Sequence, residues 1–99
     1  MIDASRIALT GLNAAERRLA VSAHNTANAN TPNFSAQRVV QSSVAGGGVR
    51  TDVVDIVGQG VSLEEEIIEQ NLSTYTFQAN LKVIQVQKEL DRTLLDINA

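Results

Sequence analysis

Catalysis in this chain would have to begin with its single histidine, His24. A Ser-His-Asp site could be written from His24 and any of several Ser and Asp residues, since such a site needs a nucleophile, a base and an orienting carboxylate. Nothing in the sequence positions those residues together, and a His late in an Ala-rich helix is more often a surface or interface residue. The sequence therefore predicts no catalytic residue and no enzyme.

Two short runs also contain the residue types of a ligand site. Glu64-Glu65-Glu66 has the carboxylates of a metal or acid-base site, but acidic residues in a first helical turn are expected from the helix dipole. Gly46-Gly47-Gly48 resembles a phosphate loop, but no Lys-Ser/Thr pair follows and no helix is expected to start there. We expect both runs to be structural, with no metal, no cofactor and no small-molecule substrate.

The composition favours packing between helices over a deep pocket. A chain of 99 residues forms at most one compact domain with a small core. Apolar residues make up 43% of the chain but aromatic residues only 3%, so burial must come from Leu, Ile, Val and Ala. The net charge is −3 and the basic residues are scattered, which indicates no nucleic-acid partner. The absence of Cys excludes disulfides and zinc-thiolate sites.

The sequence also bears on membrane insertion and export. No apolar run approaches the ~20 residues that span a bilayer. Asp3 and Arg6 stand where a signal peptide would have its apolar stretch. We expect no membrane span, and we expect any export to use a route without an ordinary cleaved signal.

The first predicted element is a helix over residues 3–29. Ile2, Leu9, Leu12 and Leu19 recur on one side, and the stripe is widened by Ala8, Ala15 and Ala23. Asp3 is the predicted N-cap, with Ile2 and Ile7 at the two positions of a hydrophobic staple. The segment 28–32 ends the helix, because Asn and Thr compete for backbone hydrogen bonds and Pro32 disfavours helical geometry at Thr31.

The middle of the chain, residues 36–61, has the pattern of a small β-hairpin. Its two β-prone segments, 38–44 and 49–57, are separated by the three glycines at 46–48. Two strands alone are marginal in water, so this hairpin needs a helix or a neighbouring subunit beneath it. Gly58-Gln59-Gly60 is the predicted flexible joint into the last element.

The second predicted helix, 62–97, has the clearest pattern in the sequence. Ser62 is its predicted N-cap, and Glu65 stands where it completes a capping box. Residues in steps of four, three and four form an apolar stripe with an eleven-residue period, which predicts a nearly straight or slightly right-handed packed helix. This apolar stripe consists of Ile68, Leu72, Tyr75, Ala79, Val83, Val86, Leu90, Leu94 and Ile97. A second apolar edge, Phe77, Leu81, Ile84 and Leu95, predicts more than one neighbour.

The segment Asn25–Phe34 resembles a signature of flagellar rod, hook and hook-associated proteins. That signature reads Asn-x-Ala-Asn-x-Asn-Thr followed by a turn that ends in an aromatic residue. The family usually has Gly before the aromatic, whereas this chain has Asn33, which tolerates the left-handed conformation better than most residues other than Gly. The stretch from Tyr75 to Leu95 is similar to the family's closing helix, with its aromatic-Gln-Ala-Asn core. The matching motif residues are Asn25, Ala27, Asn28, Asn30, Thr31, Phe34, Gln78, Ala79 and Asn80.

The resemblance implies a structural subunit of the flagellar basal-body rod, which crosses the periplasm and serves motility. It implies terminal helices that polymerise as the inner layer of a tubular assembly, with itself and other rod or hook proteins as partners. It also implies export by the flagellar type III apparatus without signal cleavage. The short middle places the chain nearer the proximal-rod type. The predicted assembly interface comprises Leu9, Leu12, Leu19 and the apolar stripe.

The predicted fold is mainly α and forms a single rod-type domain over residues 1–99. It has an N-terminal helix and Asn-rich turn (1–35), a β-prone middle (36–61) and a C-terminal helix (62–99). The two helices are expected to pack as an antiparallel, coiled-coil-like pair with the hairpin at one end. The alternative function is a cytosolic helical adaptor or a flagellar export chaperone, which would share the long helices but would not explain Asn25–Phe34.

Overall fold

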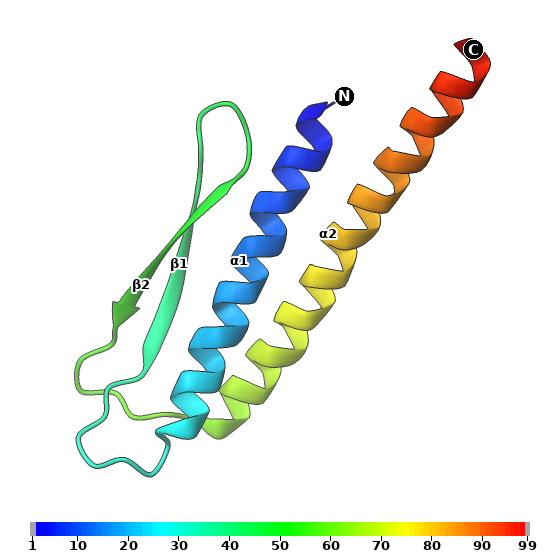
Figure 1. Cartoon of the computed structure of the whole chain (residues 1–99). Coiled ribbons are helices and arrows are strands. Elements are labelled where there is room, and N and C mark those ends of the chain that lie inside the picture. The colour runs from blue at the N-terminus through cyan, green and yellow to red at the C-terminus, as the bar shows by residue number, and fades with distance from the viewer. Residues whose placement is uncertain (1, 99) are drawn as a thin grey trace.

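The computed structural model describes residues 2–98, with side chains described for residues 4–97. The chain runs through α1 (Ile2–Ala27), β1 (Gln37–Ser43), β2 (Val49–Asp55) and α2 (Leu63–Asn98). Figure 1 shows α1 in the middle, with α2 antiparallel to it on one side and the hairpin on the other. The predicted fold class, two long helices with a small hairpin in the middle segment, is confirmed.

The observed helix ends differ slightly from the predicted ones. Because α1 begins at Ile2, Asp3 lies inside the helix and is not its N-cap; the side chains of Ile2 and Asp3 are outside the described residues. The helix ends at Ala27, two residues early, where the backbone changes to i−3 bonds such as Ala29 N–H to Thr26 O at 3.2 Å. The side-chain amide of Asn28 also donates to His24 O at 2.9 Å. At the start of α2, Ser62 Oγ accepts the Glu65 N–H at 3.4 Å, as predicted for the cap.

The hairpin lies along α1, not at one end of the helix pair as predicted. β1 pairs with β2 in antiparallel register from Gln37↔Asp55 to Ser43↔Val49. Seven residues of strand cover about 24 Å, so the tip reaches the first turns of α1. There Arg6 donates to Gly46 O at 2.9 Å, and Thr10 Oγ1 accepts the Val49 N–H at 3.1 Å. The second strand ends at Asp55, not Val57, because the chain turns at Gly58, where φ is +82°.

The two helices meet along a seam of small and polar side chains. On α1 the seam repeats every seventh residue through Ala8, Ala15 and Ser22, which are buried. On α2 the matching repeat is Glu66, Ser73, Asn80 and Gln87, of which Asn80 is half-buried and the others are buried. A seven-residue repeat is the period of coiled-coil packing. The predicted coiled-coil-like pair is therefore present, but its seam contains almost no large apolar side chain.

Candidate assembly interface

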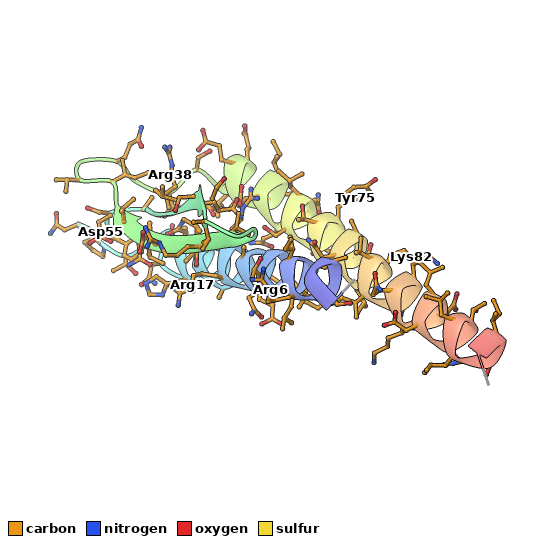
Figure 2. The ribbon with its side chains drawn as sticks, turned by 90° about the horizontal axis from the view of Figure 1, so that it is seen from above. Arg6, Arg17, Arg38, Asp55, Tyr75 and Lys82 are labelled. Carbon is orange, nitrogen blue, oxygen red and sulfur yellow. The ribbon has the colours of Figure 1, made fainter. Side chains whose placement is uncertain are left out.

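The apolar stripe lies on the surface of α2 that α1 leaves uncovered. Ile68, Tyr75 and Ile97 are 65–72% exposed, and the other large stripe residues are 43–50% exposed. Figure 2 shows the Tyr75 side chain pointing away from α1. The structure thus places all nine predicted positions on the surface of the isolated chain.

The position of the stripe follows from its offset from the seam. Ile68 comes two residues after Glu66, a rotation of about 200° around the helix axis. The stripe therefore starts on nearly the opposite side of α2 from α1. Small side chains fill the contact between the two helices, and the large apolar side chains of the stripe are left exposed. The assembly interface remains a prediction, and its residues lie where a neighbouring subunit could contact them.

The predicted interface residues of α1 lie outside the seam as well. Leu9 and Leu19 are 51% and 41% exposed, and Leu12 is half-buried. Leu19 and Phe77 line the same shallow, mainly apolar hollow of about 290 Å³ between the helices. Leu19 of α1 and Phe77, one residue of the second apolar edge of α2, are thereby brought together on one face of the pair.

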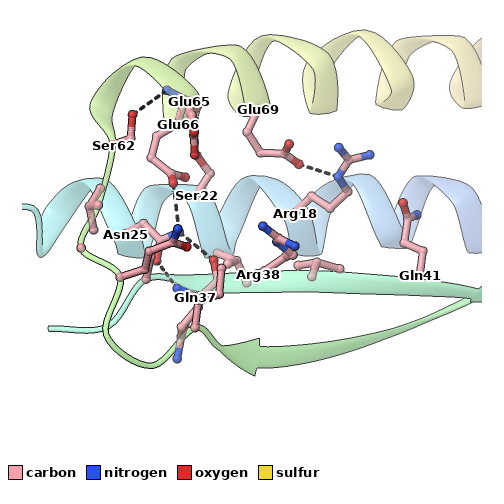
Figure 3. A pocket seen from close by; sticks show the side chains of 17 residues that line it. Arg18, Ser22, Asn25, Gln37, Arg38, Gln41, Ser62, Glu65, Glu66 and Glu69 are labelled. Atoms are coloured by element: carbon pink, nitrogen blue, oxygen red, sulfur yellow. Dashed lines mark hydrogen bonds and ion pairs between the residues drawn. The ribbon is translucent and has the colours of Figure 1, made fainter.

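Asn25 joins three elements at the base of the pair. Its Nδ2 donates to Gln37 O at 2.9 Å and to Glu66 Oε2 at 3.2 Å, while its Oδ1 accepts the Gln37 N–H at 2.9 Å (Figure 3). Ser22 Oγ donates to Glu66 O at 3.1 Å, and Asn25 and Ser22 are almost completely buried. This single amide fixes the end of α1, the start of β1 and the first turn of α2 relative to one another.

The turn after α1 is held by local hydrogen bonds. Thr31 Oγ1 donates to Asn28 Oδ1 at 3.1 Å, and the Phe34 N–H donates to Thr31 O at 3.3 Å. The Phe34 ring packs edge-on against His24, with 5.5 Å between the ring centroids. Asn33 has φ of +63°, the left-handed conformation expected where the family has Gly.

Residues 6–34, which comprise most of α1 and this turn through Phe34, match the family model described as flagella basal body rod protein. The chain carries a flagellar basal-body rod signature. The predicted family resemblance is confirmed, and it supports a rod component located in the flagellum. The rod family is a structural family and not an enzyme family. No curated protein matches the chain.

The predicted motif residues, of which Gln78, Ala79 and Asn80 lie outside the matched residues 6–34, divide into inward and outward residues. The inward group makes contacts within the chain, although Thr31 is itself exposed, and its members are Asn25, Asn28, Thr31, Phe34 and Asn80. The outward group is exposed on the isolated chain, and its members are Ala27, Asn30, Gln78 and Ala79. The inward residues build the subunit, whereas the outward ones are free to contact neighbours.

Sequence reasoning missed the partners of the rod signature within the chain. Glu66 accepts hydrogen bonds from both Ser22 and Asn25. Arg18 forms an ion pair with Glu69. The available signal was the seven-residue spacing of small and polar residues, which a search for apolar periodicity does not detect. Over the described residues, neither helix has an apolar stretch long enough to cross a bilayer.

Proposed function

We propose that the chain is a structural subunit of the flagellar rod that polymerises by burying the apolar stripe of α2 against neighbouring subunits. The exposed stripe is the observation that carries this proposal, because apolar patches of this extent are typical of interaction sites. The accessible surface is 7016 Å², whereas a compact monomer of 10.6 kDa would expose about 5,500 Å². This excess of exposed surface fits a subunit that buries part of its surface against neighbouring subunits.

The partners in this proposal are further copies of the chain and other rod or hook proteins. The periplasm-spanning location, the contribution to motility and the export by the type III apparatus without a cleaved signal rest on the rod signature. The exposed Gln78 and Ala79 lie beside or within the stripe, so residues of the family motif would take part in the same contacts.

Leu72→Asp tests the proposal, with Lys88→Ala as its control. Leu72 is 48% exposed and lies on the stripe, whereas Lys88 is exposed and lies off it. A charge at Leu72 would have to be desolvated in any contact that covers the stripe, at a cost of several kcal/mol. Loss of an exposed Lys costs under ~1 kcal/mol.

We expect Leu72→Asp to fold with an unchanged helix content but to lose self-association and co-assembly with rod proteins in sedimentation, and to lose swimming in cells. Lys88→Ala should retain all of these. Motile Leu72→Asp cells at equal expression would contradict the proposal. A stable dimer that never grows, with or without rod proteins, would favour the adaptor or export chaperone instead.

A further inference from the structure

The strand β1 has one paired edge and one open edge. The Val44 N–H donates to Gly48 O at 3.1 Å and the Ile56 N–H donates to Ala36 O at 2.8 Å, which continues the register of the ladder at both ends. In an antiparallel pair the bonding alternates along the strand, so the even-numbered residues of β1 face β2. The peptide groups facing the opposite edge are those of Gln37, Val39, Gln41 and Ser43.

The first position of this open edge is already occupied by a side chain. The Asn25 amide donates to Gln37 O and accepts the Gln37 N–H, both at 2.9 Å, which is the pair of bonds that a third strand would make. Beyond it, no described residue bonds to the outward N–H or C=O of Val39 or Gln41. An open, mainly polar groove of about 740 Å³ runs beside this edge, bounded by β1, α1 and the first turns of α2 (Figure 3).

The outer edge of β2 has the complementary arrangement. Thr10 Oγ1 accepts the outward Val49 N–H at 3.1 Å and so occupies one end of that edge. The outward peptide groups of Thr51, Val53 and Asp55 have no hydrogen-bond partner among the described residues. Side chains of α1 therefore block one end of each edge, and each edge keeps a similar length of free donors and acceptors.

We propose that the open edge of β1 binds the open edge of β2 in a second copy of this chain, so that neighbouring hairpins join into one continuous antiparallel sheet. The proposal rests on the proposed function, because it requires copies that follow one another in the same orientation. In that arrangement β1 of one copy runs antiparallel to β2 of the next. The contact joins two different surfaces, so it repeats along an array instead of closing a pair.

The charges of the two strands favour pairing of β1 with β2 of the next copy over pairing of β1 with a second β1. The strand β1 carries Arg38 as its only charged residue, whereas β2 carries Asp52 and Asp55 against Arg50. Arg38 of one copy would thus share a sheet with Asp52 and Asp55 of the next. Glu65, Glu66 and Glu69 also line the groove beside this edge, and of these Glu69 is paired with Arg18 and Glu66 accepts a hydrogen bond from Asn25. Pairing of two β1 edges would instead bring the two Arg38 side chains onto the same short sheet.

Proline substitution tests each edge separately. Gln41→Pro and Val53→Pro each remove an N–H that points away from the hairpin ladder, so each should preserve the fold by circular dichroism. Ala45→Pro is the matched control, because Ala45 is the second residue of the Val44–Gly47 turn, whose third residue Gly46 has φ of +90°. Proline is common at that turn position.

We expect the unchanged chain and Ala45→Pro to associate equally in sedimentation, and Gln41→Pro and Val53→Pro to require roughly tenfold higher concentration. An equimolar mixture of these two variants should associate better than either alone, since the mixture restores one intact β1–β2 contact. If both variants assemble as the unchanged chain does while Leu72→Asp fails, the edge contact is overturned and the proposed function stands. If the unchanged chain does not associate under any condition, both are overturned.

Discussion

Gly11 of α1 lies directly against the side-chain amide of Asn80 in α2. A Cβ at Gly11 would lie 2.7 Å from Asn80 Oδ1 and 2.9 Å from its Nδ2, closer than non-bonded atoms approach. Asn80 is also held by its own helix, since Nδ2 donates to Thr76 O at 2.9 Å. The absence of a side chain at Gly11 thus sets how closely the two helices pack around Asn80, a residue of the predicted family motif.

Gly11→Ala should lower the free energy of unfolding by about 1 kcal/mol, because displacement of the Asn80 amide outweighs the higher helix propensity of Ala. The double variant Gly11→Ala/Asn80→Ala should recover that loss, since the overlap is then removed. Urea unfolding of the two single variants and the double variant measures the coupling between the sites. Additive effects would show that the two residues do not compete for space.

Asn25→Ala should destabilise the chain by roughly 2–4 kcal/mol, because it removes three hydrogen bonds and leaves the buried Glu66 carboxylate without its amide donor. Asn30→Ala is the matched control within the same motif, since Asn30 is exposed, and it should change stability by less than ~0.5 kcal/mol. Thermal unfolding of both variants at one protein concentration gives the comparison. Equal melting temperatures would mean that Asn25 does not join the three elements.

Ser22→Ala and Ser73→Ala should have effects of opposite sign, although both serines are only 1% exposed. Ser22 Oγ donates to Glu66 O, so its loss should cost about 1 kcal/mol. Ser73 Oγ is buried without a hydrogen-bond partner among the described residues, so its removal should stabilise the chain by up to ~1 kcal/mol. Denaturant midpoints of the two variants test this, and a destabilised Ser73→Ala would indicate a partner for that hydroxyl.

Asn33→Gly should leave stability unchanged within ~0.5 kcal/mol, since Gly adopts a φ of +63° without strain but orders at a greater entropy cost. Asn33→Val should cost about 1–2 kcal/mol, because a β-branched residue is strained in that conformation. Calorimetry of the two variants distinguishes the requirement for the left-handed conformation from a requirement for the Asn side chain. If Asn33→Gly were as unstable as Asn33→Val, the side chain would be the essential part.

The helices, the hairpin and the turn could be predicted because each is encoded locally. The eleven-residue spacing, the three glycines and the Asn28–Pro32 segment specify periodicity, chain reversal and helix termination within short windows. The seam could not be predicted, because an apolar stripe is ordinarily assumed to pack inside the same chain. Here Ala15, Ser22 and Ser73 occupy that position, and small residues such as these give no hydrophobic signal. The placement of the hairpin depended on Arg6 and Thr10, which are distant in sequence from the residues they contact.

On α2, the seven-residue seam that faces α1 and the eleven-residue apolar stripe turn around the helix axis in opposite directions. Ile68 lies about 200° from Glu66 near the start of α2, whereas Leu90 lies about 300° from Gln87 near its end. A neighbour that follows the apolar stripe must therefore cross α2 obliquely, moving by roughly 100° relative to the α1 seam between Glu66 and Gln87. In the proposed assembly, sliding along such an oblique track would also require rotation, so this geometry would resist axial slippage between neighbouring subunits.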